Sequence, residues 1–264
     1  METIDLQIAD GVGTILLNRP ESLNAWNRQF GDELLEAVRR VTDDDAVRAV
    51  CVRGAGRAFS SGADLRDNIT GQELTPEGHP DVRTRLHEVY HPIIVGLRRM
   101  PKPVVAAVHG PAVGIGCSLA LACDLIVASE SAYFMLAFVN IGLVPDGGSS
   151  VFVPTRAGMA RAAEMAMLGE RVPAARALDW GLINRVVADD AFDDHVRALT
   201  EGLAAGPTRS YAGTKRQLNN WLYARMDEQL ELEADIQQEM AATGDFAEGV
   251  TAFIQKRAAG FRGA

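Results

Sequence analysis

Polar and apolar positions alternate in the first twenty residues of the chain. The alternation covers residues 4–8 and 14–17, and Asp10-Gly11 lies between them, which is typical of a β-hairpin. The segment from about residue 27 to residue 41 instead carries apolar residues at helical spacing. We therefore expect a hairpin followed by an amphipathic helix.

The middle of the chain alternates between strand and helix patterns. Buried strands are expected at 47–52, 104–108 and 124–128, with helices at about 82–99 and at 117–122. The longer helix contains Pro92 and is expected to be interrupted near it. Small residues dominate 54–64, and 66–80 lack periodicity, so both segments are expected to be loops, the second a mobile one. The alternation of strands with helices favours an α/β core.

From about Asp190 onward the pattern is helical only. Gly206-Pro207 and Thr243-Gly244 are the expected breaks between these helices. We divide the chain into a core at 1–195 and a C-terminal helical region at 196–264. The helical region is expected to take part in oligomer contacts.

Composition and charge restrict the classes of partner. The 264 residues carry a formal net charge of −9, which disfavours a nucleic-acid or anionic-membrane surface. No uninterrupted apolar run reaches membrane-spanning length, and we expect no signal peptide. The three cysteines are odd in number, have apolar neighbours and form no CxxC pair, so a reduced, cytoplasmic protein is expected.

Residues 87–91 (HEVYH) formally match the HExxH pattern of zinc metalloproteases. Pro92 follows directly, and a residue that precedes proline is disfavoured in the α region. We therefore expect that His87 and His91 do not share one helical face, and that the chain binds no metal there.

Two glycine turns lie at expected strand-to-helix junctions, Gly62-Ala63 and Gly114-Ile115-Gly116. Glycine permits positive φ and close backbone approach, and the first N–H groups of a helix lack an internal acceptor. Such N–H groups bind a developing oxyanion, although most turns of this kind are purely structural. The second turn does not continue as GxGxxG and no Walker A lysine follows, so a nucleotide site is not expected.

Longer motifs surround these turns: AFSSGADL (58–65), PKPVVAAVHGPAVGIGCSLALACDLIVAS (101–129), FVNIGLVPDGGSS (138–150), ALDWGLINRVV (177–187) and AFIQKRAAGF (252–261). Together they resemble the enoyl-CoA hydratase/isomerase (crotonase) superfamily over nearly the whole chain. The resemblance implies a spiral of ββα units with a C-terminal helical region, assembled as a trimer or a dimer of trimers. It also implies an acyl-CoA thioester substrate, no separate cofactor, and an oxyanion hole formed by the N–H groups of Ala63 and Ile115.

The same resemblance implies contacts with the substrate. The backbone of residues 58–60 resembles the adenine-side wall of the CoA groove, and residues 19–23 resemble part of the same groove. Three tail residues resemble those that approach CoA, although packing and solvation of a terminal helix explain them equally well. The expected substrate-binding residues are Ala58, Phe59, Ser60, Gly62, Tyr90, His91, Gly114, Phe138, Phe253, Lys256 and Phe261.

Acid–base residues set this chain apart from the hydratases of the superfamily. Those enzymes use two glutamates, one to deprotonate water and one to deliver a proton. Ser118 and Phe138 stand at the corresponding positions of this sequence, and neither side chain can do carboxylate chemistry. We therefore expect no efficient hydratase activity from these two positions.

Asp146 is the carboxylate in the most informative place. Propensity alone favours a turn or helix-cap role for it. In enoyl-CoA and dienoyl-CoA isomerases of the superfamily, however, a carboxylate at this site moves the proton. The string 137–148 is most similar to the branch of the phenylacetyl-CoA epoxide isomerase, which Tyr90 also fits. We expect apolar neighbours such as Leu143 to raise the pKa of Asp146, so that it serves as the single base of an isomerase.

Three alternatives remain open from the sequence. A hydratase could use a substitute acid from the loop at 66–80, such as Asp67 or Glu73. A non-catalytic member would bind acyl-CoA without exchanging an α-proton. His91 stands near the place where the isomerase branch commonly has Asn. The 4-chlorobenzoyl-CoA dehalogenases of the superfamily pair a His at a similar place with an Asp at the site of Asp146. An aryl-CoA dehalogenase or hydrolase is therefore a distant third alternative.

Overall fold

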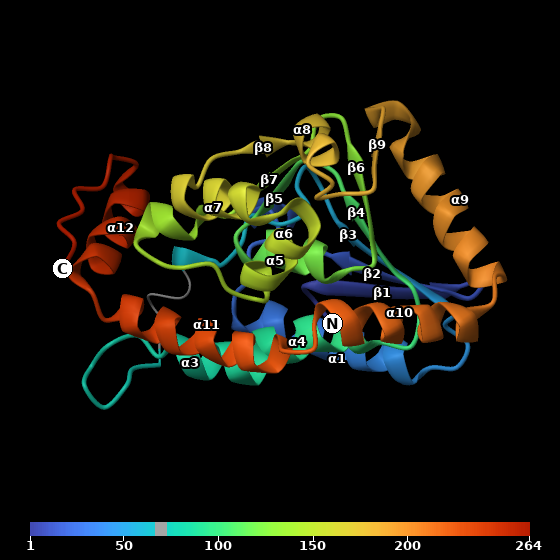
Figure 1. Ribbon diagram of the computed structural model, residues 1–264, viewed down its shortest axis with the longest axis horizontal. Coiled ribbons are helices and arrows are strands. Elements are labelled where there is room, and N and C mark those ends of the chain that lie inside the picture. The colour runs from blue at the N-terminus through green and yellow to red at the C-terminus, as the bar shows by residue number, and fades with distance from the viewer. Residues whose placement is uncertain (67–72) are drawn as a thin grey trace.

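A six-stranded sheet forms the centre of the chain (Figure 1). The computed structural model describes residues 1–66 and 73–264. The strands lie in the order β1-β2-β3-β4-β6-β9; β1 and β2 are antiparallel, and the other neighbouring pairs are parallel. Their bounds are β1 Ile4–Ala9, β2 Val12–Leu17, β3 Ala49–Gly54, β4 Val104–Val108, β6 Leu125–Ser129 and β9 Arg185–Val187. The expected hairpin and the three expected buried strands are confirmed.

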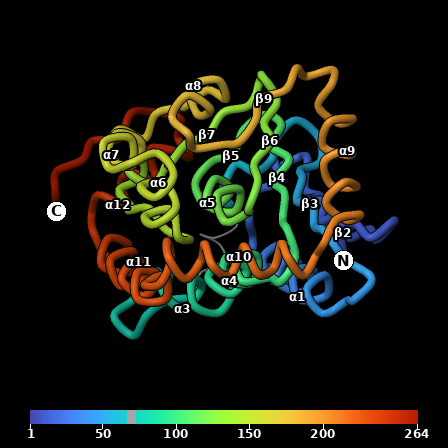
Figure 2. Tube along the Cα trace, turned by 45° about the vertical axis from the view of Figure 1, so that its right-hand side comes forward, coloured from blue at the N-terminus to red at the C-terminus, as the bar shows by residue number. Residues whose placement is uncertain are grey.

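Alternate side chains of the central strands enter two separate apolar layers, because side chains of a strand point to opposite faces. The first layer is the main core and the second is closed by α9, which lies along one side of the sheet (Figure 2). Val50, Val52 and Val104 belong to the first layer, and Cys51, Val105 and Ala107 to the second. Both faces of the sheet are therefore buried, as expected for an α/β core.

Helices surround the sheet and extend the chain beyond it. α1 contacts β1 and β2, and the side chain of Asn27 caps its first turn by accepting from Phe30 N–H at 2.9 Å. Short 3-10 segments lie at Pro20–Ser22, Ala137–Ile141 and Asp189–Ala191. The helices are α1 Arg28–Asp43, α3 Val82–Arg85, α4 His91–Arg99, α5 Ile115–Ala122, α6 Ser149–Ala157, α7 Met159–Leu168, α8 Ala174–Asp179, α9 Phe192–Ala205, α10 Thr208–Leu222, α11 Met226–Ala241 and α12 Gly244–Gln255.

The segment before Pro92 differs from the expectation. A π-helical turn at Leu86–Tyr90 joins α3 to α4, and His91 adopts the α conformation with φ −62° and ψ −43°. The N–H of His91 bonds to the carbonyl of Leu86, so a widened turn absorbs the proline without breaking the helix. The rings of His87 and His91 therefore lie 5.5 Å apart, and the expectation that they do not share a face was wrong. Within 1–66 and 73–264, no group of three His, Cys, Asp or Glu residues is arranged to hold a metal ion.

A small three-stranded sheet carries the turn that leads into α5. Its strands are β5 Pro111–Val113, β7 Tyr133–Met135 and β8 Val172–Pro173, in the order β5-β7-β8. Gly114 follows β5 directly with φ +54°, and α5 begins at the next residue. All eight residues of α5 are buried, so this helix is a rigid element inside the core.

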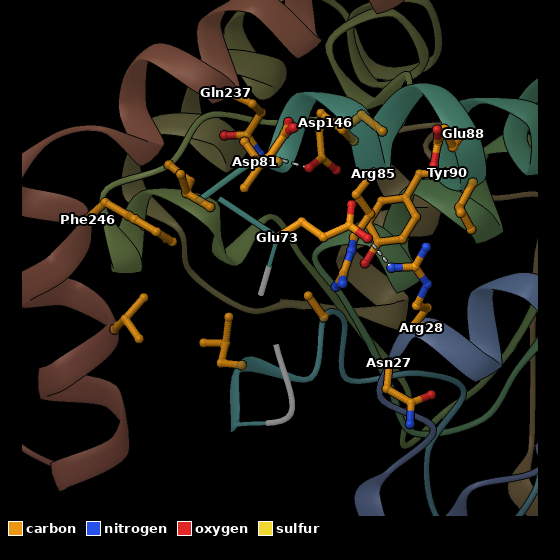
Figure 3. Close-up of a pocket in the computed structure, with 17 residues that line it drawn as sticks. Asn27, Arg28, Glu73, Asp81, Arg85, Glu88, Tyr90, Asp146, Gln237 and Phe246 are labelled. Atoms are coloured by element: carbon orange, nitrogen blue, oxygen red, sulfur yellow. Dashed lines mark hydrogen bonds and ion pairs between the residues drawn. The ribbon is translucent and has the colours of Figure 1, made fainter. Parts of the chain in front are cut away.

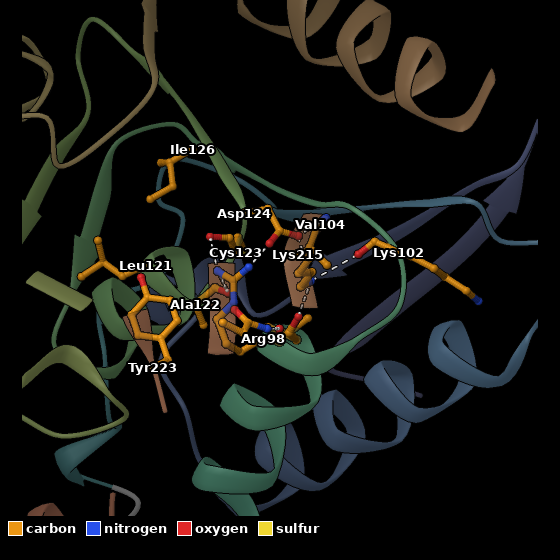
Figure 4. Close-up of polar contacts among 12 residues, drawn as sticks. Arg98, Lys102, Val104, Leu121, Ala122, Cys123, Asp124, Ile126, Lys215 and Tyr223 are labelled. Atoms are coloured by element: carbon orange, nitrogen blue, oxygen red, sulfur yellow. Dashed lines mark hydrogen bonds and ion pairs between the residues drawn. The ribbon is translucent and has the colours of Figure 1, made fainter. Parts of the chain in front are cut away.

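Buried cations hold the C-terminal end of α5 (Figure 4). Arg98 donates to the carbonyl oxygens of Ala122 and Cys123 at 3.1 and 3.2 Å, and it also pairs with Asp124. Lys215 of α10 donates to the same aspartate at 2.8 Å. Positive charge at the C-terminal end stabilises a helix through its dipole. α5 is thus fixed at the end opposite to its free N–H groups.

The C-terminal part of the chain is helical from Asp189 onward, as expected. The breaks at Gly206-Pro207 and Thr243-Gly244 separate α9 from α10 and α11 from α12, and a further break at 223–225 was not expected. α9 runs across the proposed division at residue 195, which remains a prediction. α11 contacts α3, α6 and α12, so the C-terminal helices pack against helices from the middle of the chain. No described helix combines the length and the apolar character needed to cross a bilayer.

Candidate active site

The two glycine turns lie against each other. A methyl group on Gly62 would come within 2.9 Å of the carbonyl oxygen of Val113 and 3.7 Å of the α-carbon of Gly114. Gly62 has φ +93°, a conformation that other residues rarely adopt. Two backbone bonds hold the segments in this register, from Ser60 N–H to the Pro111 carbonyl at 3.0 Å and from Val113 N–H back to the Ser60 carbonyl at 2.9 Å. Glycine at both turns therefore allows the contact.

Two backbone N–H groups beside these turns have no acceptor in the described part of the chain, those of Ala63 and Ile115. Trp26 forms a parallel bridge with Ala63 by bonding to Gly62 and Asp64, which leaves the N–H of Ala63 itself unused. Ile115 is the first residue of α5, where N–H groups have no partner inside the helix and the dipole is positive. Both groups are thus available to a negatively charged oxygen.

Asp146 presents a buried carboxyl group, which Figure 3 shows beside the side chain of Gln237. The side chain of Asp146 is 6% exposed. Oδ2 accepts a hydrogen bond of 2.7 Å from Nε2 of Gln237 on α11, whereas Oδ1 has no hydrogen-bond partner among the described residues. Burial raises the pKa of Asp146 to about 8, against the lowering effect of the Gln237 bond and with the support of nearby Glu233. A carboxyl group with such a pKa both accepts and returns protons near neutral pH.

The side chain of Asp146 does not cap the helix that follows it. α6 begins at Ser149, and its first N–H groups lie beside the carboxylate of Glu233, which is also on α11. Glu233 accepts from Gly148 N–H at 2.8 Å and from Ser150 N–H at 3.1 Å. The cap that propensity assigned to Asp146 is therefore supplied by a residue from a distant helix, which leaves Asp146 for another role.

The backbone of Asp146 is fixed to α5. Ser118 Oγ donates to the carbonyl oxygen of Asp146 at 2.8 Å, and the Ser118 side chain is fully buried. Next in the chain, Gly147 has φ +61°, and a methyl group on it would come within 2.4 Å of Ile115 Cδ1 and 3.0 Å of Ser118 Cβ. The segment that carries the carboxyl group thus packs directly on the first turn of α5, whose N-terminal residue is Ile115.

A pocket of about 120 Å³ brings Ala63 and Asp146 together. Apolar side chains from four separate parts of the chain, 63–65, 82–90, Leu143 and 246–250, form most of its wall, and charged groups lie among them (Figure 3). It is lined by Asn27, Arg28, Ala63, Leu65, Glu73, Asp81, Val82, Arg85, Leu86, Glu88, Val89, Tyr90, Leu143, Asp146, Gln237, Phe246 and Val250. An apolar pocket with a few polar groups and a carboxyl group of raised pKa is the usual form of a site for a small organic group.

The other carboxylates of the pocket differ from Asp146 in their surroundings. Asp81 caps α3 by accepting from Thr84 N–H at 2.9 Å. Glu73 is paired with Arg28, and both side chains are more than half exposed. Glu88 is exposed. Of the two substitute acids considered above, Glu73 therefore reaches the pocket as a solvated ion pair, and Asp67 lies outside the described residues.

The residues expected near the acyl group divide into two sets. Tyr90 lines the pocket, and burial raises the pKa of its hydroxyl to about 12. Phe138 lies beside the second turn, because a methyl group on Gly114 would come 4.0 Å from its ring. His91 is buried but does not line the pocket, and burial together with the neighbouring His87 lowers its pKa to about 4.

The residues expected to contact CoA lie away from this pocket. The side chains of Ala58, Phe59 and Ser60 are fully buried, so only their backbone could meet a ligand. The tail residues Phe253 and Phe261 are 59% and 45% exposed, and Lys256, also exposed, ends α12. None of these six residues lines the pocket described above.

Sequence reasoning missed the contribution of α11 and α12. Gln237 and Glu233 lie one turn apart on α11 and meet the segment around Asp146, while Phe246 and Val250 of α12 line the pocket. The sequence gives one signal for Glu233 and Gln237: polar residues recur every four positions along this helix. That signal predicts a polar face but not its partner.

Comparison with known proteins gives matches along nearly the whole chain. The family model for enoyl-CoA hydratase/isomerase matches residues 7–264. The 1,2-epoxyphenylacetyl-CoA isomerase of Escherichia coli strain K12 is 39% identical over 264 residues, which cover 100% of this chain and 99% of the relative. A Rhodobacter capsulatus protein named "Probable enoyl-CoA hydratase" is 41% identical over 261 residues, 99% of this chain and 98% of that protein.

A solved structure gives the same picture. The crystal structure of an enoyl-CoA hydratase from Mycobacterium avium subsp. paratuberculosis K-10 superposes with a TM-score of 0.88 at 39% identity. The match covers 98% of this chain and 98% of that one. The predicted α/β crotonase architecture with its C-terminal helices is confirmed by this match. Relatives of nearly equal similarity carry the names of both an isomerase and a hydratase, so the residues of the site must decide between these activities.

Proposed function

Because the chain belongs to the enoyl-CoA hydratase/isomerase family, we propose that it is an enoyl-CoA isomerase that moves a double bond with Asp146 as its single base. One observation carries the proposal. Asp146 is buried in the pocket that Ala63 also lines, with a raised pKa and one unpartnered oxygen, while Ser118 and Phe138 occupy the positions of the hydratase glutamates. A 1,3-proton shift needs one carboxylate, whereas hydration needs a second acid–base group.

The proposed reaction uses the groups of the site in order. Ionised Asp146 removes a proton from C2 of a 3-enoyl thioester, and the electron pair moves to the thioester oxygen as an enolate. The N–H groups of Ala63 and Ile115 stabilise this oxygen, each contributing roughly 3–4 kcal/mol to the transition state. The protonated Asp146 then returns the proton to C4, and the double bond ends between C2 and C3. Coenzyme A takes part only as a portion of the substrate.

The buried position of Asp146 explains why one carboxylate is enough. An exposed aspartate is a weak base, because its pKa is about 3.9. At about 8, the pKa of Asp146 lies close to a working pH, so the same group is a competent base when ionised and a competent acid when protonated. Leu143 and Phe246 add apolar surface to the wall of the pocket that Asp146 lines.

The proposal also covers assembly and location. We propose a trimer or a dimer of trimers, supported by apolar side chains on the surface such as Met159, Met167 and Trp221, which are 74%, 72% and 85% exposed. Exposed apolar surface of this kind is typical of subunit interfaces. The three free, buried cysteines support a cytoplasmic protein.

The Asp146→Asn variant tests the proposal. It keeps the size and the acceptor for Gln237 but removes the proton acceptor. We expect loss of double-bond migration in a 3-enoyl-CoA, measured by the ultraviolet absorbance of the conjugated 2-enoyl product, with the binding of the thioester within a few-fold of wild type. The loss should appear in kcat rather than in KM. Asp227→Asn, which changes an exposed carboxylate on α11, is the matched control and should keep full activity.

Three readouts separate the alternatives. A folded and active Asp146→Asn enzyme contradicts the mechanism, and a wild-type protein that binds the thioester without exchanging its α-proton into D₂O is a non-catalytic member. Hydration of crotonyl-CoA that is lost in Glu73→Gln identifies a hydratase with a substitute acid, a candidate that the position of Glu73 in the pocket supports. Its exposed ion pair with Arg28 is unfavourable to that role, because the carboxylate is already engaged with a cation at the solvent-exposed edge of the pocket. The dehalogenase alternative lacks support, since His91 does not line the pocket with Asp146.

A further inference from the structure

One face of α11 carries three polar side chains that all contact the segment before and at the start of α6. Gln229, Glu233 and Gln237 are spaced four residues apart, which places them on the same side of the helix. Gln229 donates to Ser150 Oγ at 3.1 Å, and Glu233 accepts from Ser150 N–H. Gln237 stands at the end of this row, and its contact is with the carboxyl group of the site.

The orientation of the Gln237 amide is fixed from its other side. Its Oε1 accepts a hydrogen bond of 3.2 Å from the backbone N–H of Val144, which can only donate. Nε2, which can only donate, must therefore face Oδ2 of Asp146, and it does so at 2.7 Å. The Gln237 side chain is 2% exposed, so water does not compete for either bond. The amide is a rigid bridge between two points of the same loop.

This bridge makes the two oxygens of Asp146 unequal. Oδ2 is occupied by the amide, and Oδ1 is buried with no hydrogen-bond partner in the described chain. A donor that cannot turn into an acceptor favours the ionised carboxylate over the neutral acid. With Oδ2 held by the amide, Oδ1 stays the oxygen without a partner in a residue that lines the pocket (Figure 3).

We propose that Gln237 is the positioning residue of the site: its amide, held by Val144, orients the carboxyl group of Asp146 and reserves Oδ1 for proton transfer. This inference rests on the proposed function for its catalytic meaning, but its geometric content stands by itself. Gln237 acts through Asp146 and counteracts part of the effect of burial, which would otherwise leave the base protonated at a working pH.

The test begins with a measurement that needs no substrate. The chain is labelled with ¹³C at the aspartate carboxyl carbons, and the Asp146 signal is assigned by its absence in Asp146→Asn. Gln237→Met keeps the length of the side chain but removes its donor and acceptor. We expect the pKa of Asp146 to rise by about one to two units in this variant, because a hydrogen bond to a charged group is lost. Gln237→Glu keeps the shape and should couple the two carboxyl groups, so that they titrate in two macroscopic steps.

Gln229→Leu is the matched control. It removes an amide from the same face of the same helix, two turns earlier, where the contact is with Ser150 rather than with Asp146. We expect the Asp146 titration to stay within about 0.3 unit of wild type in this variant, an interval well below the shift expected from a lost charged hydrogen bond. Circular dichroism confirms that each variant is folded, and Gln237→Glu serves as the measured variant if Gln237→Met is not.

Kinetics then connects the bridge to turnover. In Gln237→Met, kcat for double-bond migration at pH 8 should fall at least about tenfold, and the rising limb of its pH profile should move by the same interval as the directly measured pKa. KM should change by no more than a few-fold. An Asp146 titration that is unchanged in folded Gln237→Met and Gln237→Glu overturns the inference, as does an equal shift in Gln229→Leu. If the pKa of Asp146 shifts as expected but the wild-type protein has no isomerase activity, the role of Gln237 is supported and the proposed function fails.

Discussion

Replacing Asp146 by asparagine should stabilise the folded chain at alkaline pH. Burial raises the pKa of Asp146 from the ordinary value of 3.8 to about 8, so the folded state holds a proton that the unfolded chain releases. Well below pH 3.8 the carboxyl group is neutral in both states and has no effect on the free energy of unfolding. As the pH rises toward 8, the unfolded state ionises freely while the folded state resists, and the folded state loses stability.

The size of this loss in stability follows from the difference between the pKa values of Asp146 in the folded and unfolded states. About four pKa units at about 1.4 kcal/mol each correspond to about 6 kcal/mol when both states are ionised above pH 8, and to about 3 kcal/mol near pH 6. Asparagine carries no charge and its Oδ1 still accepts the hydrogen bond from Gln237. The variant should therefore match wild type near pH 4 and exceed it by several kcal/mol at pH 9.

Urea unfolding at several pH values between 4 and 9 measures the difference, with the protein concentration held constant because assembly contributes to stability. Asp227→Asn is the control, since its carboxylate forms an exposed pair with Arg99 that contributes less than about 1 kcal/mol. A stability difference between wild type and Asp146→Asn that does not grow from pH 4 to pH 9 would refute the reasoning from burial.

Three further predictions concern the surrounding parts of the site and the assembly. Ala63→Pro and Ile115→Pro each remove one N–H group, and turnover of the thioester should fall at least about a hundredfold in a variant whose fold is intact by circular dichroism; near-normal turnover would contradict the oxyanion hole. Ser118→Ala removes the hydrogen bond to the Asp146 carbonyl, and steady-state kinetics should give a kcat about fivefold lower with unchanged thioester binding, so an unaltered kcat would argue against this anchor. Light scattering should give a multiple of three chains of 28.4 kDa, and a stable monomer at micromolar concentration would exclude the proposed assembly.

Local patterns predicted the elements well. The strand at 104–108 matches β4 residue for residue, and the helix expected from about residue 27 to residue 41 is α1, because apolar spacing and a capping asparagine specify it locally. The prediction for the segment around Pro92 was wrong, because the rule that proline breaks a helix does not foresee a π turn directly before it. Proline was correctly expected to disturb the regular helix, but a π turn rather than a break accommodates it.

Part of the site was also predictable, because local sequence determines it. Free N–H groups next to glycine turns follow from sequence, because glycine and a helix N-terminus determine them within a few residues. That the turns of Gly62 and Gly114 touch each other depends on packing between distant strands. The contact from Gln237 to Asp146 spans 91 positions, and no local pattern indicates which loop a polar helix face will meet.

The anchor formed by Ser118 has a consequence for how such an enzyme can evolve. Its hydroxyl holds the Asp146 backbone, and Gly147 packs so closely on Ser118 that a methyl group added to Gly147 would lie 3.0 Å from Ser118 Cβ. A glutamate at position 118 would lose this hydroxyl and would place a longer side chain against the segment that carries Asp146. Such a change removes the bond that holds the Asp146 backbone to α5 before any second carboxylate is present. A glutamate at position 118 would therefore need a compensating change near Gly147 to keep this segment in place.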